Sequence, residues 1–273
     1  MIESKKETWE KIFKFNDFEI EFKTLPGNVP IIFIKDIFKY PDEMYEFISH
    51  LDFWPTNTNL EGASVRPGLS HNFDPLLFNF LTTEFRKKFS SVFGVREMKT
   101  YMMYTTIMST DMEMDSKGLS CYPHIDSLEE GPVFASNFNL SQSKDPVVTG
   151  FWSWIGKTCF LDLTNVEKNK LQRLPDNYQK NIKWNQLKDL EDLKLESSIE
   201  MPYNSMVMYP TFFIHNPIME EGWFQDTQRV MLSIFPVFNP DDLISFSDNT
   251  VKCVWKYFRL DDFWDFYFDE TLD

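Results

Sequence analysis

The spacing of apolar residues predicts an N-terminal part that consists of a strand and helices. One uninterrupted apolar run, Val29–Ile34, predicts a buried strand. Pro41 then predicts the start of a helix, because proline suits the first helical turn and acidic residues follow it. The apolar face of this helix holds Met44, Phe47, Ile48 and Leu51. A second helix is expected within 73–93, with Leu77, Phe80, Leu81, Phe85 and Phe89 on one face.

From Met98 onward the pattern changes to short segments rich in aromatic, β-branched and Met residues, which favour strands. The expected strands are 100–110, 120–125, 133–140, 149–160, 205–209 and 229–237. Several short strands with turn signals between them predict a β-sandwich or barrel. Residues 54–73 contain Pro, Asn, Gly and Ser, and indicate a loop.

These elements predict a single, mainly β domain with flanking helices over residues 1–273. Its parts are an N-terminal strand and helices at about 1–97, a β core at about 98–240 and a C-terminal extension at 241–273. Residues 163–200 are charged and helix-prone, so we expect a helical insertion that is either a functional cover or a tolerated surface excursion. The aromatic and acidic tail is expected to pack on its own domain, with a homodimer contact as the alternative.

Composition and charge narrow the classes of function. Hydrophobic residues make up 42% of the chain and aromatic residues 17%, which indicates a folded core. The net charge of −15 repels phosphate backbones and anionic lipids, so we expect no nucleic-acid or membrane partner. No apolar stretch approaches the roughly 18 residues of a membrane span, and the N-terminus lacks a signal-peptide core. We therefore expect a cytoplasmic protein.

Two common kinds of site are absent from the sequence. Neither of the glycine-rich phosphate-binding motifs occurs. The three cysteines, Cys121, Cys159 and Cys253, include no C-x-x-C pair, which argues against a disulfide framework and a zinc ribbon.

A candidate metal site begins at His124 and Asp126. Residues two apart in a strand project from the same face, so both side chains can reach one ion while Ile125 turns away into packing. The chain has four histidines, and His215 ends an apolar, strand-like run. Two imidazoles and one carboxylate on one side of an ion leave the opposite positions open, as in non-haem iron(II) oxygenases. His124, Asp126 and His215 are therefore the predicted metal ligands.

The H-x-D spacing alone is weak evidence, because His50 and Asp52 have it too. They lie in or at the end of the helix from Pro41, where residues two apart point in different directions. We expect His50 to be a helix-surface or cap residue. His71 lies in the predicted loop and has no obvious partner.

A possible anion anchor lies on the strand after His215. Arg229, Met231 and Ser233 share one face of the predicted strand 229–237. A buried guanidinium needs an anionic partner, and its two parallel donors suit a carboxylate. Ser233 could add a hydroxyl. The alternative is that Arg229 pairs with a protein acid such as Asp226.

Together these residues resemble the 2-oxoglutarate- and iron(II)-dependent oxygenases, and within them the prolyl-hydroxylase-like branch. The matching residues are His124, Asp126, His215 and Arg229. The resemblance covers about 98–240, where 149–151 and 204–210 resemble the strands after the H-x-D and before the distal histidine. Two departures are the long interval containing 163–200 and an extra acidic loop before the H-x-D.

The resemblance implies a double-stranded β-helix core, also called a jelly-roll or cupin-like fold. It further implies Fe(II) as metal, with 2-oxoglutarate and O2 as co-substrates and succinate and carbon dioxide as co-products. Arg229 would hold the far carboxylate of 2-oxoglutarate, with Ser233 and Tyr104 as further candidate contacts. Because Asp126 is present where halogenating relatives have a small residue, the resemblance implies hydroxylation or a related oxidation and not halogenation.

The substrate is not determined by the sequence. Trp152 and Trp154 share a strand face and could line a substrate pocket, but aromatic residues at this spacing are more often core. A small metabolite, an amino acid or a protein side chain is expected as substrate. Two other hypotheses remain: a cupin-like metal-binding protein without oxygenase turnover, and a binding protein on the same scaffold.

Overall fold

The computed structural model describes residues 2–51, 54–55, 69–72, 75–93, 98–108, 123–126, 134–177, 192–218, 220, 223–224 and 226–238. Its α-helices are α1 (Ile2–Ile12), α2 (Pro41–Ser49), α3 (Pro75–Phe93) and α4 (Asn165–Asn177). Its strands are β1 (Ile20–Leu25), β2 (Val29–Ile34), β3 (Trp54–Pro55), β4 (Leu69–Asn72), β5 (Met98–Met108), β6 (Phe134–Asn139), β7 (Val147–Trp154), β8 (Leu193–Met201), β9 (Ser205–Pro210), β10 (His215–Ile218) and β11 (Arg229–Phe238).

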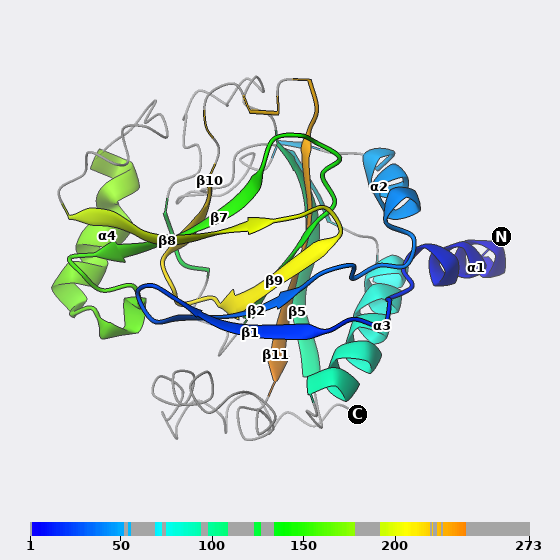
Figure 1. Cartoon of the computed structure of the whole chain (residues 1–273), viewed down its shortest axis with the longest axis horizontal. Helices are drawn as coiled ribbons and strands as arrows, with labels where there is room; N and C mark the ends of the chain where they lie inside the picture. Colours follow the sequence, from blue (N-terminus) through cyan, green and yellow to red (C-terminus); the bar gives the residue numbers. More distant parts are fainter. Residues whose placement is uncertain are drawn as a thin grey trace.

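The strands form two antiparallel sheets (Figure 1). The large sheet has the order β1-β2-β9-β6-β11-β5-β4-β3, and the small sheet has the order β10-β7-β8. From β5 onward the chain passes repeatedly between the two sheets. Strands β5, β6, β9 and β11 join the large sheet, and β7, β8 and β10 form the small sheet. The segment around His124 pairs with β10, so it extends the small sheet. This alternation is a double-stranded β-helix, and it confirms the predicted fold class of a mainly β protein with flanking helices.

The N-terminal elements complete the large sheet and cover its outer face. Strand β2 is buried along its whole length and pairs with β9. Helix α2 begins at Pro41, as predicted, and buries Met44 and Ile48. On α3, the rings of Phe85 and Phe89 stack, and Phe85 also contacts Phe138 of β6. The helices therefore bury the outer side chains of the large sheet.

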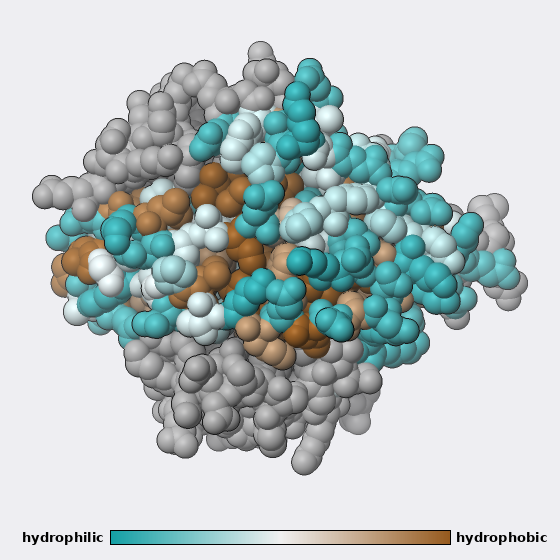
Figure 2. Space-filling model, viewed as in Figure 1, coloured by the Kyte–Doolittle hydropathy of each residue, from teal (hydrophilic) through white to brown (hydrophobic). Residues whose placement is uncertain are grey.

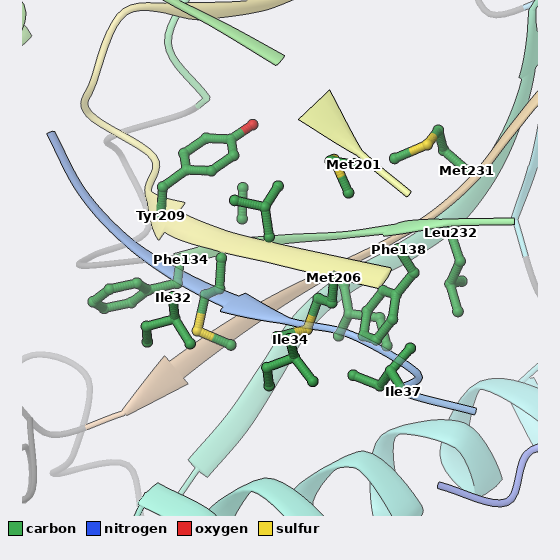
Figure 3. Packing of buried hydrophobic residues seen from close by; sticks show 14 of the residues in the cluster. Ile32, Ile34, Ile37, Phe134, Phe138, Met201, Met206, Tyr209, Met231 and Leu232 are labelled. Atoms are coloured by element: carbon green, nitrogen blue, oxygen red, sulfur yellow. The ribbon is translucent and has the colours of Figure 1, made fainter. Parts of the chain in front are cut away.

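Figure 3 shows how side chains alternate across this sheet. Ile34, Met206 and Phe138 point toward the helices, whereas Tyr209 and Met231 point to the opposite side. That opposite side is the interior between the two sheets, where the ring of Tyr209 meets Phe151 of β7 in an edge-to-face contact. The large sheet thus has an apolar outer face and a partly polar inner face.

The structure corrects the expected helical insertion at 163–200. Helix α4 occupies 165–177, but Leu193–Met201 form β8, which pairs with β7. Leu193, Ile199 and Met201 of β8 are buried, while charged residues between them remain accessible. Its Lys and Glu residues suit a helix in isolation, and pairing with β7 overrides that propensity.

Smaller differences lie in the N-terminal part. The segment expected to be a loop, 54–73, contributes the short strands β3 and β4, so His71 lies in a strand. Strand β1 forms a hairpin with β2 that the mixed pattern of residues 1–25 did not reveal. The acidic loop 111–118 and the C-terminal extension 241–273 lie outside the described residues, so the expected tail packing is not described.

The surface in Figure 2 places hydrophobic residues in the middle of one face, with hydrophilic residues around them. Among the described residues, the large hydrophobic side chains that are most accessible are Leu76, Ile155 and Val166. No described helix combines the length and the apolar character that crossing a bilayer requires.

Candidate metal centre

The site is built on a short antiparallel pairing between two segments far apart in sequence. The backbone N–H of His124 donates to the carbonyl of His215 at 2.9 Å, and His215 donates back to His124 at 2.8 Å. In such a doubly hydrogen-bonded pair, the two side chains lie opposite each other on the same face. The imidazole centroids are accordingly 4.7 Å apart.

Asp126 completes the cluster from the same segment as His124. Its N–H donates to the carbonyl of Thr211 at 3.2 Å, which ties the Asp126 backbone to the segment that leads to His215. One carboxylate oxygen lies 3.3 Å from Nε2 of His215, and the other lies 3.9 Å from Nε2 of His124. All three ligand atoms fall within 4.8 Å of one another. The structure therefore brings the three predicted ligands together.

The hydrogen bond of His215 fixes which of its nitrogens faces the cluster. Nδ1 lies 2.8 Å from the carbonyl of Phe213, and a carbonyl can only accept, so Nδ1 carries the hydrogen. A metal-bound imidazole is neutral, so in that state Nε2 presents a lone pair on the side of the Asp126 carboxylate. Two electron-rich atoms 3.3 Å apart repel each other unless a cation or proton lies between them. This donor set therefore fits a divalent metal ion, with the Phe213 carbonyl orienting one ligand.

The residues next to the ligands point the other way, into a second hydrophobic cluster. Ile125, between His124 and Asp126, packs against this cluster, as predicted. Ile214, immediately before His215, is completely buried in it. The alternation of a strand thus separates ligands on the inner side from packing on the outer side.

The other two histidines occupy different environments. His50 is the C-cap of α2, and its exposed ring donates through Nδ1 to the carbonyl of Glu46 at 2.7 Å. It is therefore a cap residue, as expected, and Asp52 lies outside the described residues. His71 lies in β4, whose backbone pairs with Thr105 of β5 at this position.

A chain of hydrogen bonds joins β11 to the metal centre. The hydroxyl of Ser233 donates to Oδ1 of Asn137 at 2.7 Å, and Nδ2 of Asn137 donates to the hydroxyl of Tyr209 at 2.9 Å. The ring of Tyr209 packs edge-on against the imidazole of His215, with centroids 4.8 Å apart. Asn137 and Tyr209 were not predicted as site residues. The available signal was the pair Asn137 and Asn139 at alternate positions of the predicted strand 133–140, on the face opposite Phe134 and Phe138.

Arg229 is the first residue of β11 and its side chain is 6% exposed. It lies four residues before Ser233 on the same strand, so both belong to the inner face of the large sheet. Asp226, the alternative partner, is exposed. The backbone of Tyr104 pairs with Ser233 in the adjacent strand β5.

The two tryptophans proposed as pocket residues lie in the second hydrophobic cluster. Trp152 is 0% exposed and Trp154 is 4% exposed, and both belong to the same buried cluster as Leu171 of α4. Their burial agrees with the alternative that they are core residues. Cys159 is buried as well, but it belongs to the main hydrophobic core and not to this cluster.

No protein-family model matches the sequence, and no curated protein matches it either. Solved structures with related arrangements include HygX from Streptomyces hygroscopicus with nickel and 2-oxoglutarate bound, at 11% identity and a TM-score of 0.47. That alignment covers 76% of this chain and 82% of HygX. A second is SnoN, a non-heme alpha-ketoglutarate-dependent epimerase from nogalamycin biosynthesis, at 10% identity and a TM-score of 0.45 over 87% of this chain and 80% of SnoN. A third, the carbocyclase SnoK from the same biosynthesis, has 8% identity and a TM-score of 0.35 over 72% of this chain and 71% of SnoK.

Proposed function

We propose that this protein is an iron(II)- and 2-oxoglutarate-dependent oxygenase. The observation that carries the proposal is the cluster of His124, Asp126 and His215, whose ligand atoms lie within 4.8 Å of one another on a double-stranded β-helix. Three protein ligands on one side of an ion leave room for exchangeable ligands on the other. That is the requirement of a catalytic centre, whereas structural zinc sites are closed by four protein ligands.

In this proposal the three ligand side chains hold the metal, and each has a separate support. His215 is oriented by the Phe213 carbonyl, and the backbone pairing with His215 fixes His124. A bound Fe(II) would supply activation of O2 and oxidation of a substrate C–H bond. The ligand side chains are only 6–14% exposed, so the protein excludes most water from the reacting groups.

Arg229 is the proposed anchor for the far carboxylate of 2-oxoglutarate. A guanidinium that is 6% exposed is stabilised by an anion, and its fork matches a carboxylate in two parallel hydrogen bonds. Its strand is linked to the metal centre through Ser233, Asn137 and Tyr209. Ser233 and Tyr104 remain the further candidate contacts.

The proposed reaction is hydroxylation or a related oxidation and not halogenation, because Asp126 occupies the ligand position that a halide would need. The proposed substrates are a small metabolite, an amino acid or a protein side chain. The net charge of −15 argues against nucleic acid and anionic membranes as partners.

An anaerobic titration with Fe(II) and 2-oxoglutarate tests the proposal directly. A weak visible charge-transfer band should appear only when both are present, and succinate should form from 2-oxoglutarate on exposure to air. Metal binding with neither band nor succinate would contradict the oxygenase and support the cupin-like metal-binding protein instead.

A further inference from the structure

We propose that helix α4 is a buttress for the metal centre, and that Trp152 and Leu171 are positioning residues acting on His124, Asp126 and His215. The inference rests on the proposed function, because it requires that these three residues hold a metal. It gives a role to the helical part of the insertion, whose sequence left open a functional cover or a tolerated excursion. This role is neither a cover over the site nor a tolerated excursion, because α4 packs on the side of the ligand-bearing segments that faces away from the metal ligands.

The second hydrophobic cluster joins α4 to the backs of the ligand segments. It has three contributions: the small sheet, the neighbours of the metal ligands, and α4 with the turn before it. Its buried members are Trp152, Trp154, Phe160, Leu163, Leu171, Leu193 and Ile214, and Ile125 packs against them. Ile125 separates His124 from Asp126 and Ile214 precedes His215, so packing in this cluster sets the position of all three ligands.

Trp152 adds two hydrogen bonds that enclose His215. Its backbone N–H donates to the carbonyl of Ile214 at 2.8 Å, on one side of His215. Its indole Nε1–H donates to Oδ1 of Asn216 at 2.7 Å, on the other side. Asn216 is 0% exposed, so this hydrogen bond forms without competition from water. The register of β10 on β7 is therefore fixed at the ligand.

Helix α4 is itself held firmly to the small sheet. Thr164 and Glu167 form a capping box, in which the Glu167 carboxylate accepts from the Thr164 N–H and the Thr164 hydroxyl accepts from the Glu167 N–H. The same carboxylate forms an ion pair with Lys157 at 2.9 Å. Lys157 exchanges two backbone hydrogen bonds with Trp154 at the end of β7. The helix start and the tryptophan strand are thus tied together, beside the small sheet (Figure 1).

A substitution at Leu171 should therefore change the metal affinity although Leu171 is not a ligand. Removing its side chain opens a cavity in the cluster that also holds Trp152, Ile214 and Ile125, so the packing behind the ligands can relax. Metal sites depend on ligand placement within a fraction of an ångström. Loss of a partner that is hydrogen-bonded to a ligand typically weakens metal binding about 10- to 100-fold, and the lower end of this range is the scale expected for lost packing.

The test compares Leu171→Ala with Leu81→Ala in the intact chain. Both remove a buried leucine from a helix, at 5% and 4% exposure, but Leu81 lies in the main core with α3 rather than behind the ligands. Co(II) serves as the probe, with affinity measured by calorimetry and ligand geometry by its visible absorption bands. We expect Leu171→Ala to weaken Co(II) binding about tenfold or more and to change the bands. Leu81→Ala should lower Tm comparably and leave both Co(II) measurements unchanged.

Trp152→Phe provides a milder variant should Leu171→Ala fold poorly. It keeps an aromatic ring but removes the indole donor to Asn216, so Co(II) binding should again weaken while Val166→Ala, on the exposed side of α4, has no effect. If wild type, Leu171→Ala and Trp152→Phe all bind Co(II) equally well, the proposed positioning role of α4 and Trp152 is wrong. If wild type and variants behave as expected but 2-oxoglutarate is never turned over, only the proposed oxygenase function fails.

Discussion

Two polar residues of β11 face the interior between the sheets and have different capacities toward an anion. The hydroxyl hydrogen of Ser233 is given to Asn137, so in this arrangement Ser233 offers a carboxylate only lone pairs. Arg229, four residues earlier, has only donors and keeps its charge at every accessible pH. In the proposed function Arg229 therefore carries the attraction for 2-oxoglutarate, and Ser233 holds Asn137, which in turn donates to the Tyr209 hydroxyl.

This difference predicts the effect of Arg229→Ala. Losing the charged partner of a buried carboxylate costs about 2–5 kcal/mol, so 2-oxoglutarate binding should weaken roughly 30-fold or more while Co(II) binding stays nearly unchanged. Arg229→Lys should be intermediate, because it retains charge without the planar fork. Calorimetry with each ligand measures both affinities. Equal loss of metal and 2-oxoglutarate binding would mean that Arg229 is a structural residue.

At the scale of elements, the sequence predicted the strands and helices whose apolar residues follow a clear pattern. The uniform apolar run gives β2, the Pro41 start gives α2, and the spacing of Leu77 to Phe89 gives α3. Strand β8 was missed because its intrinsic preference and its environment disagree: Lys and Glu favour a helix, and pairing with β7 decides otherwise. The sequence also could not decide whether Trp152 and Trp154 line a pocket or belong to the core. Alternation shows that they share a strand face, but not what covers that face.

Helix α4 carries a pH-dependent anchor at its N-terminus. The hydrogen bond from Lys157, followed by that from the Thr164 backbone, lowers the pKa of Glu167 from 4.5 to about 2. A carboxyl whose pKa is lower in the folded state stabilises the fold above its unfolded pKa, and this stabilisation is lost as pH falls from about 4.5 toward 2.

Glu167→Gln should therefore lower Tm at pH 6, and the difference from wild type should shrink as the pH is lowered toward 2. Lys157→Met should reproduce most of the difference, because Lys157 is the largest cause of the shift. Thermal unfolding followed by circular dichroism across this range measures it. A difference between wild type and Glu167→Gln that stays constant with pH would show that the Glu167 carboxyl is not perturbed.

At the scale of the whole molecule, the metal centre joins two parts of the chain that are distant in sequence. Among the described residues, the H-x-D segment meets β10 through the pairing of His124 with His215, which extends the small sheet. The sequence could name the three ligands from residue chemistry and a choice among four histidines. It could not supply the pairing itself, because this contact depends on how the chain passes from β9 in the large sheet to β10 in the small sheet.

A metal bound at this junction should stabilise the whole fold, because the unfolded chain cannot bring the three ligands together. With free Co(II) at 100 times its Kd, linkage predicts about 2.7 kcal/mol of added stability, a rise in Tm of roughly 5–10 °C for a domain of this size. Asp126→Ala should abolish the rise. His50→Ala should retain it, because His50 belongs to the other H-x-D sequence and only caps α2. An equal rise in Asp126→Ala would place the ion elsewhere on this acidic protein, where carboxylates bind cations without the geometry that an oxygenase needs.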